Sequence, residues 1–322
     1  MASSTTPETS SLAQASEFFA FPNADLTIVT ADKIKFSVHK LIMSMVSEVF
    51  KDMVSLDEVN PSHPHSENST APPSAVVDVT ESSSTMNIIL RMIYHAPREG
   101  TPSFEEISAM LETIDKYQMS GLWDVAQDII LTHPLLKQNS LRVYAISKKY
   151  SLRRVSDAIL PSIVSLDFRT LSLSEIPREL DNIPFSEYLK LSFYAKQRAS
   201  LILKKIETVS MPGTIPICTC RRDKTRVLPT YISTLTRDLR CVSWAKFVEL
   251  AKLELEKTPD SSVLRDEIRV RAANEVDCPF ALKWMFEGCK TVFVALRASV
   301  DATPWSFEDE YNSLRGGSAT RW

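Results

Sequence analysis

Cysteine is the residue type whose spacing in this chain comes closest to a chemical site. Cys218 and Cys220 are separated by one residue, whereas Cys241, Cys278 and Cys289 follow singly. Four thiolates can hold a structural zinc ion, but the cysteines of such sites usually come in pairs with about two to four residues between them. Because the pair here is tighter and no second pair follows, we predict reduced, partly buried thiols and no metal site.

A thiol can also act as a nucleophile. One alternative function is therefore a thiol-dependent enzyme in the C-terminal helices, using Cys218, Cys220 or Cys241 together with an acid, and another is a zinc-stabilised module there. A catalytic cysteine is expected to be exposed and to have a depressed pKa, so thiol reactivity distinguishes an enzyme from a protein with inert cysteines.

The histidines offer no better candidate. The chain has five of them, and no two have the i, i+4 spacing with which a helix presents two ligands to one metal. His63 and His65 lie in a polar stretch without further ligands nearby, which favours a solvated loop. His39 stands at the expected start of a helix with no nucleophile indicated nearby, so we predict a capping or packing role rather than a catalytic base.

Familiar catalytic and nucleotide-binding motifs are absent from the sequence. It contains no G-x-S-x-G, no G-x-G-x-x-G, no Walker A loop and no H-E-x-x-H. The basic cluster at 221–226 contains an acid and no interleaved aromatic side chain, which is typical of a solvated loop. We therefore predict a non-enzymatic protein with no catalytic residues and no cofactor.

Composition restricts the classes of protein and partner. The chain has 322 residues, 44% of them hydrophobic, with six glycines and a net charge of −3. This length predicts two domains, or one core with a large extension, and the scarcity of glycine favours helices. The small net charge gives no reason to expect nucleic acid or an anionic membrane as partner. No apolar run reaches the ~18–20 residues that a membrane span requires.

The start of the chain and the number of cysteines indicate a compartment. Residues 1–17 are rich in serine and threonine and contain no lysine or arginine, which is typical of a disordered leader rather than a secretory signal. Five cysteines, an odd number, fit reduced thiols. We expect an intracellular protein of the cytoplasm or nucleus.

After the leader the sequence carries its clearest structural pattern. Apolar and polar residues alternate over 26–31 and again over 34–38 around a polar corner, which predicts a β-hairpin. Over 41–53 the apolar residues recur every three or four positions, which predicts a helix with one wide apolar face. Since Ser37 and Ser44 are available as caps, this segment forms either one helix or two short ones.

Further motifs follow this hairpin and helix in a specific order. They are Phe36-x-Val38-His39-Lys40, a strand-like run at 76–79, a helix from Met86 that ends at Ile93-Tyr94, and a segment at 107–122 containing Lys116-Tyr117-x-Met119. In their order and spacing these motifs resemble a BTB/POZ domain. The resemblance implies an α+β core, in which the hairpin and a third strand pack on a helical cluster, and it implies protein–protein association.

The resemblance also implies where such a domain dimerises. In the family, the dimer is often built from the start of the domain and its first helix, and an acid of the first strand lies with a base after the histidine in a pocket at the interface. The predicted dimer interface comprises Phe18, Phe19, Phe21, Asp25, Lys40, Leu41 and Met45. The alternatives are that the three phenylalanines cover the chain's own core, and that Asp25 caps the strand entry while Lys40 is solvated.

Beyond the core the pattern is helical. The run at 141–150 resembles the helical extension that follows BTB domains in many fungal proteins, which implies stacked helix pairs that present a second surface. We expect further helices at 152–163 with a kink or interruption at Pro161, at 188–209, after a cap at Ser243, at 263–276 and at 281–298, before a polar tail from Pro304.

These patterns divide the chain into five parts. They are a disordered leader at 1–17, a BTB/POZ domain at 18–135 with a mobile loop at 57–75, a helical extension at 136–210, an all-α C-terminal region at 211–314 and a tail at 315–322.

The predicted function is a non-enzymatic protein–protein interaction module that acts through homo- or hetero-dimerisation and recruits a partner, as a scaffold or adaptor. The alternative within the binding class is a substrate adaptor of a cullin-type ubiquitin ligase. Its candidate motif is Pro97-Arg98-Glu99, with proline where such adaptors usually have an apolar residue. No kelch-like repeat or zinc-finger array follows the core as a reader of substrate or DNA.

Overall fold

The computed structural model describes residues 17–59, 75–98, 100–167, 170, 172, 176–211 and 241–316. The chain divides into two compact units. The N-terminal unit comprises Met1–Asn139 with Tyr150–Val155, and the C-terminal unit comprises Ser140–Lys149 with Ser156–Trp322. Of the predicted loop at 57–75, residues 57–59 extend a helix and Ala75 begins a strand, whereas 60–74 lie outside the described residues.

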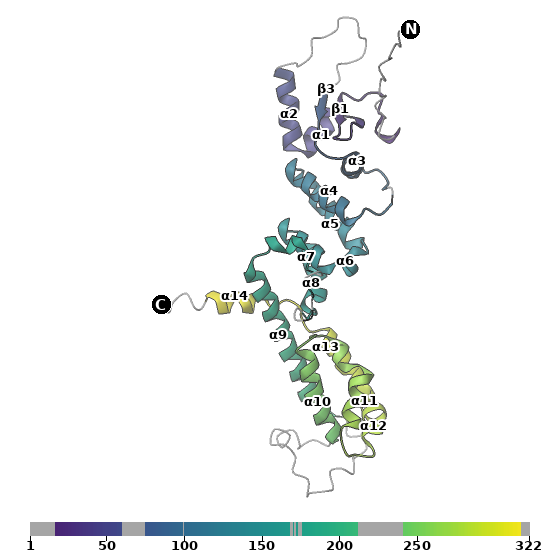
Figure 1. Cartoon of the computed structure of the whole chain (residues 1–322), viewed down its shortest axis with the longest axis vertical. Helices are drawn as coiled ribbons and strands as arrows, with labels where there is room; N and C mark the ends of the chain where they lie inside the picture. Colours follow the sequence, from purple (N-terminus) through teal and green to yellow (C-terminus); the bar gives the residue numbers. More distant parts are fainter. Residues whose placement is uncertain are drawn as a thin grey trace, which may run out of the picture. The chain divides into compact units, whose positions relative to one another are not determined.

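The N-terminal unit contains a three-stranded sheet of order β2-β1-β3 (Figure 1). Strand β1 (Leu26–Val29) pairs antiparallel with β2 (Lys35–Val38), which confirms the predicted hairpin. On its other side β1 pairs parallel with β3 (Ala75–Asp78). The hairpin turn is closed by Thr30, whose buried hydroxyl accepts a hydrogen bond from the Ile34 amide at 3.2 Å.

Helices make up the rest of this unit and, with the sheet, confirm the α+β fold class. They are η1 (Glu17–Phe19), α1 (Lys40–Val46), α2 (Glu48–Val59), α3 (Ser83–Ile93), α4 (Phe104–Lys116), η2 (Ser120–Leu122), α5 (Trp123–Thr132) and α6 (Leu135–Gln138). Ser82 caps α3 by accepting a hydrogen bond from the amide of Thr85. Ser103 and Glu106 form the capping box of α4, in which each side chain accepts from the other's backbone amide.

The first helical segment consists of two helices, α1 and α2, and the break between them is at Ser47, a residue that was not predicted as a cap. Ser47 has an extended backbone between α1 and α2, and its side chain accepts a hydrogen bond from the amide of Phe50 at 3.1 Å. Ser37 lies inside β2 and Ser44 inside α1, so neither is the cap that we predicted. His39 takes the N-cap position of α1, but its side chain does not make a capping hydrogen bond to the helix.

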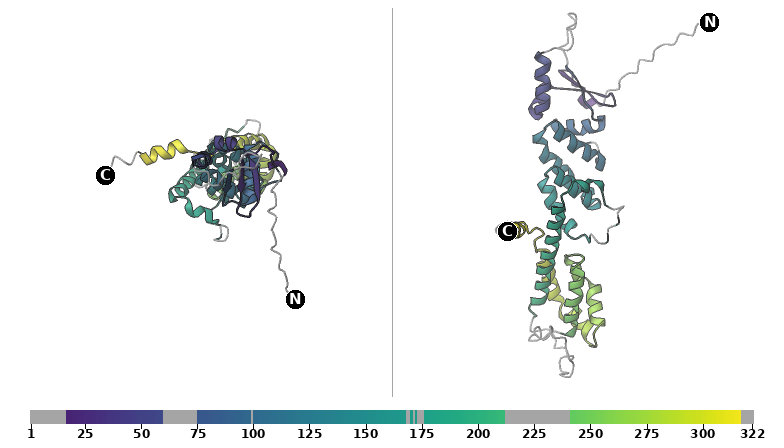
Figure 2. Two further views of the ribbon diagram at one scale, coloured as in Figure 1. Left: turned by 90° about the horizontal axis from the view of Figure 1, so that it is seen from above. Right: turned by 60° about the vertical axis from the view of Figure 1, so that its left-hand side comes forward.

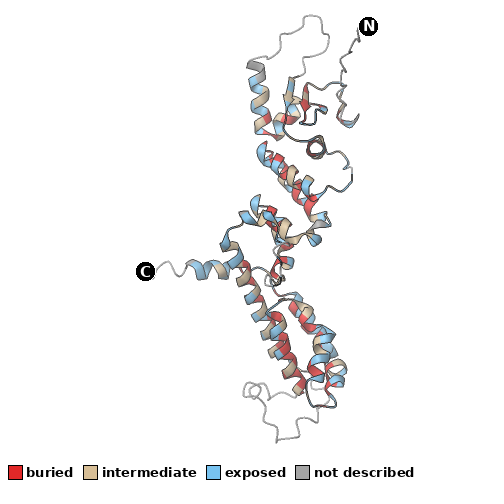
Figure 3. Ribbon diagram, in the orientation of Figure 1, coloured by how far each residue is buried: buried red, intermediate tan, exposed pale blue. Residues whose placement is uncertain are grey.

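The core of this unit is formed by the inward faces of the strands and of α1 to α4, as the buried residues in Figure 3 show. Its fully buried side chains include Leu26, Ile28, Phe36, Val38, Met43, Phe50, Met86, Ile89, Leu90, Met110, Leu111 and Ile114. Most of these residues belong to the alternating and helical patterns from which the elements were predicted. Burial of these side chains is the main stabilising contribution to the unit.

The C-terminal unit is helical throughout its described residues. Its elements are α7 (Ser140–Lys149), most of α8 (Arg153–Val164), η4 (Arg178–Asn182), α9 (Phe185–Thr208), α10 (Val242–Leu255), η6 (Ser261–Leu264), α11 (Asp266–Asn274), α12 (Ala281–Lys283), the π-helical η7 (Trp284–Gly288), α13 (Lys290–Asp301) and α14 (Glu308–Gly316). Helix α9 lies alongside α10 and also contacts α13, and α11 packs on α10 (Figure 2). Their shared core contains Ile202, Ile206, Trp244, Phe247, Trp284 and Phe293.

Some boundaries of the predicted C-terminal helices were wrong. Ser243 lies inside α10, whose N-cap is Cys241, and its buried hydroxyl has no hydrogen-bond partner among the described residues. The expected helix at 281–298 is interrupted by the π-helical turn that ends at Gly288, a residue of low helix propensity. The expected helix at 263–276 divides at Arg265, whose backbone is extended.

Two other expectations about the C-terminal unit fail in opposite directions. Helix α8 continues through Pro161, so the interruption that was one of the two expected outcomes there is wrong. Helix α14 forms where a polar tail was predicted, with three acidic residues in its first turn and Arg315 in its last. That charge order complements the helix dipole, a signal that was present in the sequence. In Figure 1, α14 points away from α10 to α13.

Candidate interaction surface

The aromatic residues at the start of the N-terminal unit do not share one environment. Phe19 is fully buried and packs against Phe36 and Tyr94, with ring centroids 5.9 and 6.0 Å away. Phe21 is half-buried and stacks on Tyr94 at 5.3 Å, whereas Phe18 is 42% exposed. Phe19 therefore belongs to the core of its own unit and is not available to a partner subunit, which corrects its assignment to the interface.

His39 joins the aromatic cluster to the sheet. Its backbone amide donates to the Tyr94 hydroxyl at 3.0 Å, and its Nδ1 lies 3.1 Å from the same oxygen. Its Nε2 lies 3.3 Å from the side-chain oxygen of Asn23, and its ring packs 5.0 Å from Phe21. Burial, together with the charge of Asp25, raises the pKa of Tyr94 above its ordinary value, so the phenol stays neutral and holds this network.

Asp25 and Lys40, the predicted charged pair, meet in the structure through the lysine backbone. The Asp25 carboxylate accepts a hydrogen bond of 2.7 Å from the backbone amide of Lys40, the first residue of α1. The contact satisfies one of the amides that every helix leaves open at its N-terminus. Through this contact with the lysine backbone, the acid fixes the junction between strand and helix.

The exposed face of α1 consists of large apolar side chains. Leu41 is 71% exposed and Met45 is 78% exposed. Since they are four positions apart, they lie on the same side of the helix. Sequence reasoning did not select two further exposed residues of this unit, Leu56 on α2 and Val76 on the edge strand β3. Their exposure depends on the order of the sheet and the packing of α2, which no local pattern reveals.

The cysteines are divided between two kinds of region. Cys218 and Cys220 lie outside the described residues, whereas Cys241, Cys278 and Cys289 are buried in the core of the C-terminal unit. The Sγ atoms of Cys241 and Cys278 are 3.6 Å apart. At 2% exposure Cys241 does not meet the accessibility expected of a catalytic thiol. Within the described ranges, no group of three or more histidine, cysteine or acidic side chains is placed to hold a metal.

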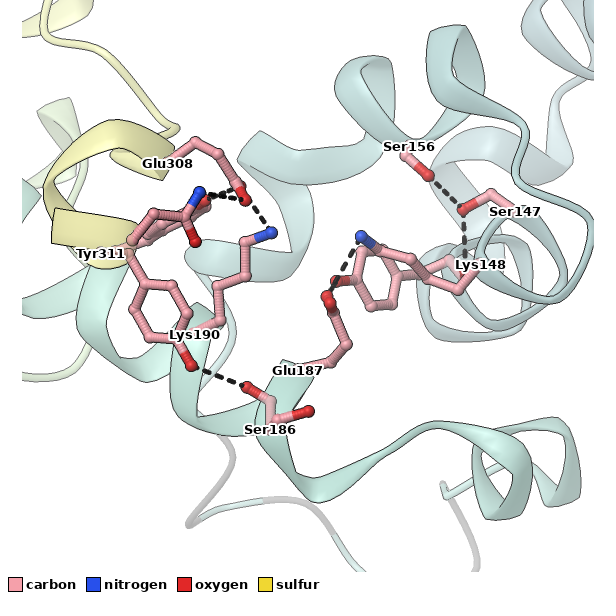
Figure 4. A network of polar contacts seen from close by, with 11 residues as sticks. Ser147, Lys148, Ser156, Ser186, Glu187, Lys190, Glu308 and Tyr311 are labelled. Carbon is pink, nitrogen blue, oxygen red and sulfur yellow. Dashed lines mark hydrogen bonds and ion pairs between the residues drawn. The ribbon is translucent and has the colours of Figure 1, made fainter. Parts of the chain in front are cut away.

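The C-terminal unit carries a polar network that joins α7, α9 and α14 (Figure 4). Glu187 on α9 accepts from the hydroxyl of Tyr144 at 3.2 Å and pairs with Lys148 at 3.1 Å. Glu308 on α14 pairs with Lys190 at 2.5 Å. Burial tends to raise the pKa of Glu308, but its hydrogen bonds, first from Lys190, hold that pKa below its usual range. The network therefore fastens α14 to α9.

A groove of about 530 Å³, lined by apolar and charged side chains, runs between α9 and the end of α10 in the same unit. Leu191, Ala195 and Leu255 are among its lining residues. A second, entirely apolar and aromatic pocket of about 420 Å³ shares Tyr188 and Leu191 with the groove. These hollows give the helical extension apolar surface beyond its core.

The candidate cullin-binding motif is only partly described. The carbonyl of Pro97 accepts a hydrogen bond from the guanidinium of Arg91, and Glu99 lies outside the described residues. Among the described helices, none combines the length and apolar character needed to cross a membrane.

Comparison with known families identifies the N-terminal unit. The family model for the BTB/POZ domain matches residues 16–134, which confirms the resemblance found in the sequence. The fold and this match define residues 16–134 as a BTB/POZ domain, which is a protein–protein interaction module. The chain therefore contains a BTB/POZ domain, which is followed by a helical C-terminal extension. No curated protein matches it.

Proposed function

We propose that this chain is a non-enzymatic adaptor that self-associates through its BTB/POZ domain and recruits a further protein partner. The interface would contain Phe18, the half-buried Phe21, Asp25, Lys40 and the exposed face of α1. The membership of residues 16–134 in an interaction family supports the general role, and the surface of α1 supports the specific location.

The observation that carries the proposal is the exposure of Leu41 and Met45. Both side chains are more than two-thirds exposed, at 71% and 78%, on one side of a helix that is otherwise anchored to the domain. Full burial of a leucine or methionine side chain contributes about 1.5–3 kcal/mol. Covering both residues with a second copy would therefore be strongly favourable.

Light scattering of the full-length chain over a dilution series tests this proposal. We expect a dimer. In the double variant Leu41→Gln, Met45→Gln, we expect the dissociation constant of this dimer to rise by roughly ten-fold or more. Glutamine keeps the helix propensity and adds no charge. The matched control is Leu56→Gln, which changes a leucine of 67% exposure on α2.

Two results would contradict the proposal. One is a monomer at every concentration of the unaltered chain. The other is an equal loss of association in the Leu56→Gln control, because the interface would then not be specific to α1.

A further inference from the structure

Two cysteines that are distant in sequence lie together in the C-terminal unit. Cys241 is the N-cap of α10, and Cys278 lies in the turn between α11 and α12. The Sγ atoms of Cys241 and Cys278 lie 3.6 Å apart, within hydrogen-bonding distance, across a sequence separation of 37 residues. Helices α10 and α11 pack on each other, so the cysteine pair lies where the chain enters and leaves this helical pair.

The local backbone allows these two sulfur atoms to come closer. A disulfide requires an S–S distance of about 2.05 Å, so the pair would have to close by roughly 1.5 Å. Cys241 precedes the helix with an extended backbone, and Cys278 belongs to a turn. Since neither cysteine lies within a regular helix, the sulfur atoms can approach each other without breaking a helical hydrogen bond at either position.

We propose that Cys241 and Cys278 form a redox-sensitive pair that a peroxide converts to an intramolecular disulfide. Both thiols are buried, so the peroxide reaches them only while the start of α10 is locally open. The thiolate of Cys241 then attacks one oxygen of hydrogen peroxide, the O–O bond breaks, and the departing hydroxide takes up a proton to give water. Cys278 then attacks the resulting sulfenic sulfur, forms the S–S bond and displaces the second water. The two electrons leave the sulfur atoms and reduce the peroxide.

The position of Cys241 explains the order of these steps. It precedes α10, a helix of 14 residues, and the N-terminus of a helix favours negative charge. A thiolate formed there has the Cys278 sulfur already in contact as the resolving group. The disulfide covalently links the start of α10 to the turn after α11. It therefore restricts separation of these two helices.

Peptide mapping of the full-length chain tests the proposal directly. The protein is exposed to hydrogen peroxide, alkylated with iodoacetamide, and digested without reductant. We expect a peptide that joins Cys241 to Cys278, reversed by dithiothreitol, and a rise of several degrees in the melting temperature of the oxidised chain. Cys241→Ser and Cys278→Ser should lose both effects, whereas Cys289→Ser, which alters another buried cysteine of the same core, should keep them.

The map of the unaltered chain decides the question even if a variant fails to fold. A dominant cross-link that uses another cysteine would overturn the proposal. So would oxidation to sulfinic acid without a cross-link, or a stoichiometric zinc ion that protects both thiols and is lost in Cys241→Ser. These outcomes are independent of the dimer measured by light scattering.

Discussion

The hydroxyl of Ser47 donates a hydrogen bond of 2.6 Å to the backbone carbonyl of Tyr117, a residue 70 positions later in the sequence. The same oxygen accepts from the amide of Phe50 at 3.1 Å and is buried. The rings of Phe50 and Tyr117 also pack with their centroids 5.1 Å apart. The break between α1 and α2 is therefore anchored to the end of α4.

We expect Ser47→Ala to lower the free energy of unfolding by about 1–3 kcal/mol. The change removes the cap of α2 and the donor to the Tyr117 carbonyl at a buried site. Urea denaturation of the variant and the unaltered chain measures this change in the free energy of unfolding. The control is Ser55→Ala, because the exposed hydroxyl of Ser55 donates only to the Lys51 carbonyl within α2. Equal effects of both substitutions would show that the long-range bond contributes nothing.

The second prediction follows from the contact between Asp25 and Lys40. Alanine substitution of the acid and of the base should lower the stability by different amounts. Asp25→Ala removes the acceptor of the Lys40 amide and is expected to cost about 1–2 kcal/mol. Lys40→Ala keeps that amide and should change the stability by less than about 1 kcal/mol. Thermal unfolding of both variants measures the difference. Equal and large losses would instead indicate a buried ion pair.

Local patterns were sufficient to predict the elements around this junction. The hairpin follows from strict alternation, and the capping box of α4 follows from Ser103 and Glu106 at the required spacing. Both depend on residues within a few positions of one another. The family resemblance brought Asp25 and Lys40 together as an acid and a base, but it did not indicate the hydrogen bond from the lysine backbone amide.

The remainder of the candidate surface depends on tertiary packing. Phe18, Phe19 and Phe21 have the same side chain, and only their packing against Tyr94 and Phe36 determines that Phe19 is buried while Phe18 is exposed. The pairing of Cys241 with Cys278 likewise requires α10 and α11 to be packed together. Spacing along the chain carries no signal for such contacts.

Glu81 gives the third prediction, which concerns acid stability. Burial tends to raise the pKa of its carboxyl, but hydrogen bonds from Lys116 at 2.7 Å and from Tyr117 at 2.7 Å outweigh it and hold the pKa below the ordinary value of 4.5. Because the folded pKa lies below the unfolded one, this stabilisation is complete above about pH 4.5 and is lost as the pH falls through the folded value.

Glu81→Gln should therefore lower the stability at neutral pH by about 1 kcal/mol and flatten its decline under acid conditions. Urea midpoints measured at intervals from pH 7 to pH 3 test this. Asp115→Asn, an exposed change of the same charge on α4, is the control and should leave the profile unaltered. A Glu81→Gln profile parallel to that of the unaltered chain would refute the prediction.

The last prediction concerns Arg198, which is buried in α9 with 1% exposure. Its guanidinium donates to the carbonyls of Pro259 at 2.8 Å, Pro304 at 3.0 Å and Val300 at 3.3 Å, and also to that of Thr303. It lies 3.4 Å from the centroid of the Trp305 ring. Burial lowers the pKa of Arg198 to about 10, so the group remains charged at neutral pH and holds the end of α13 against α9.

Arg198→Met should cost roughly 3 kcal/mol or more, because it leaves several buried carbonyls without their donor. Arg198→Lys should recover little of this loss, since an ammonium cannot reproduce the planar fork that reaches these oxygens. Thermal unfolding and hydrogen exchange of the amides in α13 and α14 measure both variants. Lys196→Met, an exposed change on the same helix, is the control. If Arg198→Met has the same melting temperature as this control, water satisfies the carbonyls at the end of α13. The guanidinium would then not be the group that holds α13 to α9.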